Sequence, residues 1–405
     1  MHAIGRERYF GWAGAVLLFL AAGLLWAGTA RAEPYLAVRE GYKCSKCHVN
    51  KTGGGMRTDF ALVYMQTRGA MWSGVAHEAP AAPAEGQAAG EATTLQDYPN
   101  GHLGDYFSVG ADLRAGYYSR TPTRSNVQER FSREAACEGC HTGANGGGKR
   151  GELFYKADLM PERAFVYGGM NLLPRVDTRE FFALLEGLPL NGYVKAGTFR
   201  LPTAFNRYYD DPFAHGQTSG NTQYLSPRGE GVELGIEAGP LAVSLSVTNA
   251  GFPEAPQETS AKRNAALGYV VFRHFTAGAS YVVDHTSAED ERRITGAFAG
   301  VSVGRFTALV ERDQIDDQAA KTDPELGTAE LNFLITKGQN VKLVYEYYDP
   351  DRDTDGDLAD RTSFIYEPFV WPYIQFRAGY REAIGPVDDP VSNYKKYFLE
   401  LHAIY

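Results

Sequence analysis

The sequence predicts an all-β fold, and three observations support that prediction. From residue 105 onward, apolar and polar residues alternate with a period of two, segment after segment. The connections between these segments are alternately long and short. The chain of 405 residues is also rich in Tyr (25), Phe (22) and Gly (45), which favours β structure. Together these features predict an antiparallel β-barrel of about 16 strands over residues 105–405, preceded by a small N-terminal segment with a short helix.

Each predicted strand has one apolar face and one polar face. In the segment 341–348, for example, Leu343 and Tyr345 alternate with Lys342 and Glu346. The last segment, Tyr394 to Tyr405, also alternates and ends on an aromatic residue, as is usual in outer-membrane barrels. The segments begin near residues 106, 151, 163, 179, 191, 230, 241, 264, 276, 292, 304, 326, 341, 361, 372 and 394.

The connections distinguish a membrane barrel from a soluble β protein. An even strand count with short turns at one end and long loops at the other is typical of outer-membrane barrels. A soluble β-sandwich or a β-rich periplasmic domain is the alternative, but it does not require this alternation. The predicted long connections are 120–150, 201–229, 250–263, 285–291, 314–325, 350–360 and 383–392, with a shorter exception at 172–178.

The N-terminus carries the features of an export signal. Arg6 and Arg8 precede an apolar run from Trp12 to Trp26, and Ala30-Arg31-Ala32 has the small-x-small pattern of a cleavage site. We therefore expect residues 1–32 to be a signal peptide and the mature chain to begin at Glu33; an uncleaved anchor is the alternative. The net charge of −9 argues against nucleic acid as a partner.

All four cysteines lie in two C-x-x-C-H motifs. The motifs are Cys44-Ser45-Lys46-Cys47-His48 and Cys137-Glu138-Gly139-Cys140-His141. This pattern is the attachment signature of c-type haem, in which two thiols bind the vinyl groups and the histidine binds the iron. A zinc site, a redox dithiol or two disulfides would also use cysteines. Because two complete motifs use every cysteine of an exported chain, we expect two covalently bound haem c groups, with His48 and His141 as axial ligands.

The two motifs belong to a longer repeat. Residues 44–57 and 137–150 align without a gap and share the cysteines, the histidine, three consecutive glycines and a closing arginine. The glycines can adopt positive φ and let the backbone pass close to a flat ligand. Arg57 and Arg150 are candidates to pair with haem propionates, although two solvated arginines are the simpler interpretation.

The repeat does not identify the second axial ligand of either iron. Met56 in the first unit is replaced by Lys149 in the second. The nearest other histidines are His77 and His102, so these are the candidate distal ligands; Met65 and Met71 come next, within a predicted helix over 58–72. Residues 33–72 therefore form the predicted N-terminal haem segment, and residues 73–104 form an Ala/Pro/Gly-rich linker.

One further motif suggests a cation. The run Asp351 to Asp357 resembles the start of an EF-hand calcium loop. Position twelve of that loop would be Thr362 instead of the bidentate glutamate, so an acidic external loop is the alternative to calcium.

Residues 105–405 resemble the outer-membrane porins, and the segment Gly192 to Pro202 is similar to a strand-and-loop signature of substrate-selective porins. The whole chain is similar to the porin–cytochrome proteins that move electrons across the bacterial outer membrane. It differs from the better-known members, in which barrel and multihaem cytochrome are separate chains. The resemblance implies a dihaem protein of the outer membrane that contacts its lipid and exchanges electrons with periplasmic or extracellular c-type cytochromes.

Two other functions stay open at this point. The barrel could be a solute channel whose haems sense redox state or are structural, or the chain could be a dihaem peroxidase or reductase. The order of elements places the first haem motif before the first strand, on the periplasmic side or inside the lumen. The second motif lies in the first long loop, on the external side.

Overall fold

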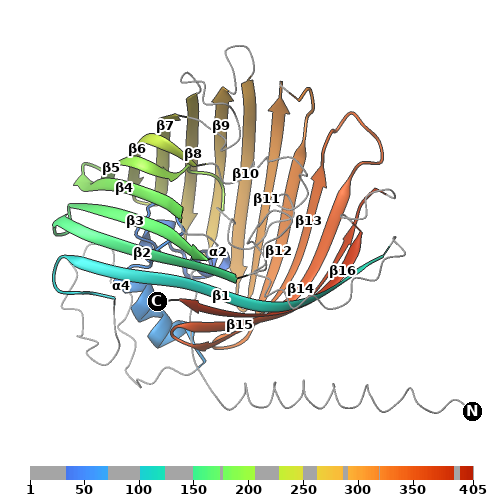
Figure 1. Cartoon of the computed structure of the whole chain (residues 1–405), viewed down its shortest axis with the longest axis horizontal. Coiled ribbons are helices and arrows are strands. Elements are labelled where there is room, and N and C mark those ends of the chain that lie inside the picture. Colours follow the sequence, from blue (N-terminus) through green and yellow to red (C-terminus); the bar gives the residue numbers. More distant parts are fainter. Residues whose placement is uncertain are drawn as a thin grey trace, which may run out of the picture.

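The computed structural model describes residues 33–71, 101–123, 149–173, 177–205, 228–249, 262–285, 291–318, 320–386 and 393–404. The strands form a closed antiparallel barrel (Figure 1), in which each strand pairs with its sequence neighbours and β1 pairs with β16. The strands are β1 (Phe107–Pro122), β2 (Lys149–Met160), β3 (Ala164–Leu173), β4 (Asp177–Leu188), β5 (Gly192–Arg200), β6 (Arg228–Ala238), β7 (Leu241–Asn249), β8 (Lys262–Phe272), β9 (Phe275–His285), β10 (Glu291–Val303), β11 (Phe306–Asp317), β12 (Glu325–Thr336), β13 (Gln339–Asp349), β14 (Ala359–Trp371), β15 (Ile374–Ile384) and β16 (Tyr394–Ile404).

The predicted all-β fold is confirmed. The barrel has sixteen strands, and each begins within two residues of its predicted start. The short connections 161–163, 189–191, 239–240, 273–274, 304–305, 337–338 and 372–373 all lie at one end, which we call the short-turn end. In outer-membrane barrels this end faces the periplasm.

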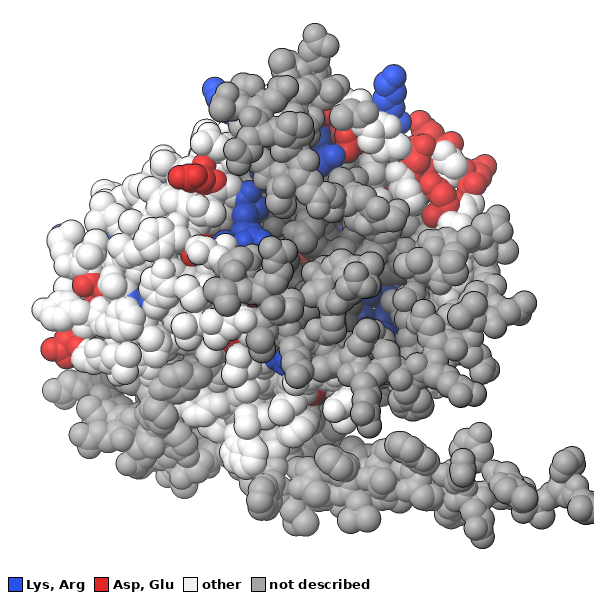
Figure 2. Space-filling view, viewed as in Figure 1, with Lys and Arg blue, Asp and Glu red and all other residues white. Residues whose placement is uncertain are grey.

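The barrel wall is apolar outside and charged inside. In β13, Lys342 and Glu346 are buried in the lumen, whereas Leu343 and Tyr345 are 49% and 44% exposed on the outer face. The outer wall seen in Figure 2 carries few charged side chains, and acidic residues gather at its upper right, over the β13–β14 connection. This arrangement is the inverse of a soluble β protein, because here lipid covers the apolar face.

The buried charges of the lumen are paired across neighbouring strands. Arg361 Nη2 lies 2.7 Å from the Glu346 carboxylate, and Arg263 Nη2 lies 2.5 Å from the Asp284 carboxylate. Such pairing offsets the cost of removing each charge from water. The period-2 pattern therefore positions a polar wall around whatever occupies the lumen.

The N-terminal segment occupies the lumen near the short-turn end. It contains α2 (Pro34–Glu40), a single turn α3 (Cys44–Cys47), α4 (Asp59–Tyr64) and a π-helical turn η1 (Met65–Gly69). Figure 1 shows this segment, drawn in blue, in the lower part of the barrel. The helix predicted over 58–72 is observed as α4 and η1, with the Thr58 hydroxyl accepting from the Ala61 N–H as N-cap. We refer to residues 33–71 as the plug.

Contacts with the turns fix the plug at this end. His274, in the β8–β9 turn, donates from Nδ1 to the Arg39 carbonyl at 2.6 Å. Lys337, beside the β12–β13 turn, donates to the Thr67 carbonyl at 2.9 Å, and the Gln66 amide donates to Tyr373 in the β14–β15 turn at 3.0 Å. Of the two positions predicted for the first haem motif, the periplasmic side or the lumen, the plug combines both: it lies in the lumen at the short-turn end.

Candidate haem site in the barrel lumen

The first C-x-x-C-H motif forms one helical turn. The α3 turn follows an extended residue, Lys43, and the His48 N–H donates to the Cys44 carbonyl at 3.0 Å. Residues three apart on a helical turn lie on one face, so Cys44 and Cys47 present their side chains together. Both are free thiols. This is the spacing and state required for attachment to two vinyl groups.

A glycine-rich hairpin holds His48. His48 pairs with Arg57 in an antiparallel bridge, and the Val49 N–H donates to the Met56 carbonyl at 3.0 Å. The hairpin turns through Gly53 to Gly55, whose φ angles are 95°, 81° and 68°. The expectation that these glycines adopt positive φ is therefore confirmed. At Gly55 the backbone passes close to a barrel side chain, since a Cβ there would overlap the Tyr167 hydroxyl.

The imidazole of His48 is held in its neutral form. Burial lowers the pKa of His48 to about 3, and the nearby Arg57 guanidinium lowers it further in the same direction. Arg57 Nη1 lies 3.3 Å from His48 Nε2, and the buried Nδ1 has no hydrogen-bond partner. A neutral imidazole is the form that binds iron.

The thiols are protonated and poorly suited to redox exchange. Burial raises the pKa of Cys47 to about 11, with Arg57 opposing part of that rise, and burial also raises the pKa of Cys44. Reactive redox cysteines have a lowered pKa instead. The environment of the motif therefore disfavours the redox-dithiol alternative.

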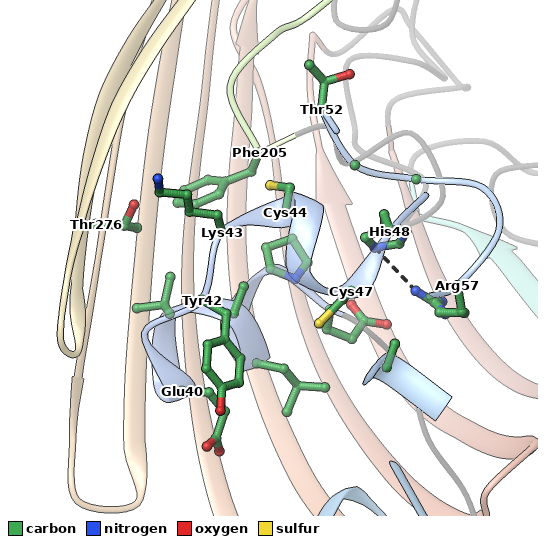
Figure 3. Close-up of a pocket in the computed structure, with 18 of the residues that line it drawn as sticks. Glu40, Tyr42, Lys43, Cys44, Cys47, His48, Thr52, Arg57, Phe205 and Thr276 are labelled. Atoms are coloured by element: carbon green, nitrogen blue, oxygen red, sulfur yellow. Dashed lines mark hydrogen bonds between the residues drawn. The ribbon is translucent and has the colours of Figure 1, made fainter. Parts of the chain in front are cut away.

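The motif opens onto an amphipathic pocket between the plug and the barrel wall (Figure 3). The aromatic residues Phe205, Tyr269 and Phe298 line this pocket. Arg57 and Arg114 also line it, as do the carboxylates of Glu33, Glu40 and Asp112. A haem has an apolar ring and two carboxylates at one edge, so the chemistry of this pocket fits the group.

A polar wall on β3, β4 and β5 holds the hairpin in place. The Asn50 amide nitrogen donates to Glu180 at 3.3 Å, and Lys195 Nζ donates to Asn50 Oδ1 at 3.0 Å. The Met56 N–H donates to the Tyr167 hydroxyl at 3.2 Å. All five side chains are buried. Nothing in the sequence identifies Tyr167, Glu180 and Lys195 as contacts of the hairpin beyond their place on the inward face of a period-2 strand.

A second anchor holds α2 on the opposite wall. Lys342 Nζ lies 3.1 Å from the Glu33 carboxylate and 3.2 Å from the Glu367 carboxylate. The same ammonium group lies 5.0 Å from the centre of the Tyr35 ring, a cation–π distance. Arg39 adds a hydrogen bond of 3.2 Å to Asn340. Glu33, expected to begin the mature chain, is thus part of the plug's attachment to the barrel.

The other predicted site residues are distributed as follows. Arg57 and Met65 line the pocket. His102 does not line the pocket, and its ring nitrogens lie 2.9 Å from Asp59 and 2.9 Å from Ser108. The Met71 N–H donates to the Phe369 carbonyl at 3.1 Å. Cys137, Cys140, His141 and His77 lie outside the described residues, as does the side chain of Arg150.

The calcium-like run lies in the β13–β14 connection. Asp351 accepts from the Asp353 N–H at 3.3 Å and from the Thr354 hydroxyl at 3.0 Å. Thr362 is exposed within β14. Within the described ranges, no group of three or more His, Cys, Asp or Glu side chains is arranged to hold a metal ion. The described helices include none that is long and apolar enough to span a membrane.

Comparison with known proteins agrees with the barrel. The family described as Gram-negative porin matches residues 176–366. The chain is a porin-like outer-membrane β-barrel. A comparison with curated proteins found no significant match.

Three solved structures illustrate the likeness, each covering 74% of this chain. The anion-selective porin from Comamonas acidovorans is 10% identical, with a TM-score of 0.54 over 99% of its chain. OmpF of Salmonella typhi, in complex with daunomycin, is 7% identical, with a TM-score of 0.53 over 97% of its chain. A loop L8 deletion mutant of OmpT from Vibrio cholerae is 9% identical, with a TM-score of 0.51 over its whole chain. At these identities the likeness concerns the fold alone.

Proposed function

We propose that this porin-like barrel carries haem c and transfers electrons between periplasmic c-type cytochromes and an external donor or acceptor. The observation that carries the proposal is the plug site: two free thiols and a neutral His48 face an amphipathic pocket inside the lumen, at the short-turn end. When bound, haem c supplies a one-electron redox centre. The chain's own part is to attach, ligate and orient that group.

Each residue of the first site has a defined part in this proposal. Cys44 and Cys47 would hold the vinyl groups, and His48 would supply one axial imidazole. Arg57 would pair with a propionate, giving up its 3.3 Å contact with His48 Nε2, the nitrogen that would bind the iron. The Gly53 to Gly55 turn would fix the hairpin that carries His48.

The second motif would provide a centre nearer the exterior. Cys137, Cys140 and His141 belong to the connection between β1 and β2, which starts at the end of the barrel opposite the short turns, and Arg150 lies at the start of β2. From Asp112, beside the plug pocket, β1 continues for ten more residues to Pro122. At about 3.3 Å per residue and a tilt of about 40°, this is a height of roughly 25 Å. If the second site lies beyond Pro122, a cytochrome would have to bridge the two sites. His77 and His102 are then proposed as distal ligands of the first site only.

A solute channel is the second candidate, and the comparisons favour it because the matching family model is that of a Gram-negative porin. In that case the plug would limit solute passage, and the haems would be sensors or structural groups. The two functions differ in whether the plug motif is needed for transport across the membrane.

Electron transfer into liposomes tests the proposal. Purified protein is inserted into vesicles that contain a redox dye, and reductant is added outside with or without a soluble c-type cytochrome. We expect dye reduction with the native chain and its loss in a Cys44→Ala/Cys47→Ala variant, while a Cys137→Ala/Cys140→Ala variant reports the second site separately. Equal dye reduction in all three proteins, or rapid uptake of small solutes independent of haem, would contradict electron transfer and support the channel.

A further inference from the structure

We propose that the barrel itself contributes to the haem site through Arg114 of β1, which binds a haem propionate and is held for that purpose by Asp112 and His402. This inference rests on the proposed function, because it concerns how the plug pocket receives its group. It adds a residue that lies outside both repeated haem units and outside the plug.

Arg114 lines the same pocket as Cys47, His48 and Arg57, although it comes from the barrel wall. Only 4% of Arg114 is exposed to solvent, so its charge lies in the protein interior. Asp112 already gives this guanidinium one carboxylate, at 3.2 Å from Nε. A planar guanidinium has five N–H donors, so it can bind a carboxylate of a bound group in addition to Asp112.

Asp112 and His402 hold Arg114 in position. Arg114 Nε donates to Asp112 Oδ1 at 3.2 Å, and His402 Nε2 lies 2.7 Å from the same oxygen. His402 is fully buried and Asp112 is 7% exposed. The register places Arg114 directly opposite His402 across the β1–β16 seam that closes the barrel. This chain of contacts fixes the guanidinium at its Nε side and orients the rest of the group.

The aromatic and the cationic lining residues come from different strands. Tyr269 and Phe298 lie on β8 and β10, which are far from β1 in the strand order. Arg57 and Arg114 are the two arginines that line the pocket in the described part of the chain. A haem has two propionates on one edge and an apolar ring beyond it. The pocket thus offers one guanidinium from the plug and one from the barrel.

Arg57 belongs to the plug and Arg114 to the barrel wall. Haem binding by both would therefore depend on the position of the plug inside the barrel. In the proposed function, Cys44, Cys47, His48 and Arg57, which hold the haem c, all belong to the plug. A propionate paired with Arg114 would tie the same group to the wall of the barrel, so its orientation and its potential would depend on the closed β1–β16 seam. Asp112 and His402 are positioning residues in this arrangement, since they act through Arg114.

The test compares Arg114→Gln with Arg361→Gln in the full-length, haem-loaded protein. Arg361 is a matched control: it is 3% exposed, paired with a carboxylate across neighbouring strands, and absent from the pocket. Removing a cation beside the haem favours the oxidised state. We expect Arg114→Gln to shift the reduction equilibrium of the plug haem towards oxidised by roughly tenfold, which is 59 mV for one electron. Arg361→Gln should leave it unchanged.

Further readouts separate the possible outcomes. Arg114→Lys keeps a positive charge, so its reduction potential should lie between those of the native chain and Arg114→Gln. The propionate-bending bands in resonance Raman spectra should change in Arg114→Gln and not in Arg361→Gln. His402→Gln, which removes a contact of Asp112 without removing a carboxylate, should give a smaller shift of the same sign. An unchanged potential and unchanged Raman bands in Arg114→Gln, with haem still attached, would overturn this inference alone. If mass spectrometry of the native chain found no haem on Cys44 and Cys47, the proposed function and this inference would both fall.

Discussion

Substitution of Gly55 by alanine tests how tightly the plug fits against the barrel. Gly55 has a φ of 68°, and a Cβ at this position would overlap the Tyr167 hydroxyl and lie 3.3 Å from its Cζ. A left-handed conformation costs a non-glycine residue about 1–2 kcal/mol. Overlap with a buried, hydrogen-bonded side chain adds about 1–3 kcal/mol. We therefore expect Gly55→Ala to weaken plug docking by roughly 2–5 kcal/mol.

Gly104 provides a matched control. Its φ is 81°, but a Cβ there would meet nothing within 4 Å. Gly104→Ala should cost only the conformational part, about 1–2 kcal/mol. In the double variant Gly55→Ala/Tyr167→Phe the overlapping hydroxyl is gone, so part of the docking energy should return.

Hydrogen exchange of the plug amides in detergent micelles measures this effect. The Met56 N–H, which donates to Tyr167 in the native chain, is the most direct reporter. We expect it to lose protection in Gly55→Ala, while amides of the barrel strands keep theirs. Equal losses in Gly55→Ala and Gly104→Ala, or strictly additive effects of Gly55→Ala and Tyr167→Phe, would refute the close packing between hairpin and wall.

Three further predictions concern the anchor, the lipid face and the lumen. Lys342→Met leaves the Glu33 and Glu367 carboxylates without their shared cation, so plug release in urea should become easier by about 3–5 kcal/mol, and adding Glu33→Gln should restore part of it. Leu343→Arg, at the middle of β13, should destabilise the barrel by about 2–4 kcal/mol, whereas Val303→Arg, at the end of β10, should cost about 0–1 kcal/mol in the same heat-unfolding gel assay. Deletion of residues 33–71 should raise single-channel conductance in planar bilayers; unchanged conductance would show that the plug does not limit passage through the lumen.

The strand pattern was predictable because lipid imposes it residue by residue. Every lipid-facing position must be apolar, and the lumen-facing positions between them carry the charges, so the alternation in residues 341–348 identifies β13 directly. The same applies to Tyr397 and Leu399 of β16, which are 62% and 47% exposed on the outer face. The lengths of the connections predicted which end of the barrel carries the short turns, the end that faces the periplasm in outer-membrane barrels.

The C-x-x-C-H turn and its glycine hairpin were also predictable from local sequence. Their geometry depends on residues within fourteen positions of one another, such as Cys44 and Arg57. The second motif remains a sequence-based prediction, since Cys137 lies outside the described residues.

The sequence by itself thus determined the barrel, its strand count and the local geometry of the first C-x-x-C-H turn, because these follow from periodicity and short-range spacing. Only the tertiary structure decided what surrounds the first motif. Asn50 meets Lys195, Glu33 meets Lys342, and Arg114 enters the plug pocket because barrel closure brings distant strands around one lumen. Strand periodicity tells which residues face inward. The register and the closure of β1 on β16 tell which of them meet.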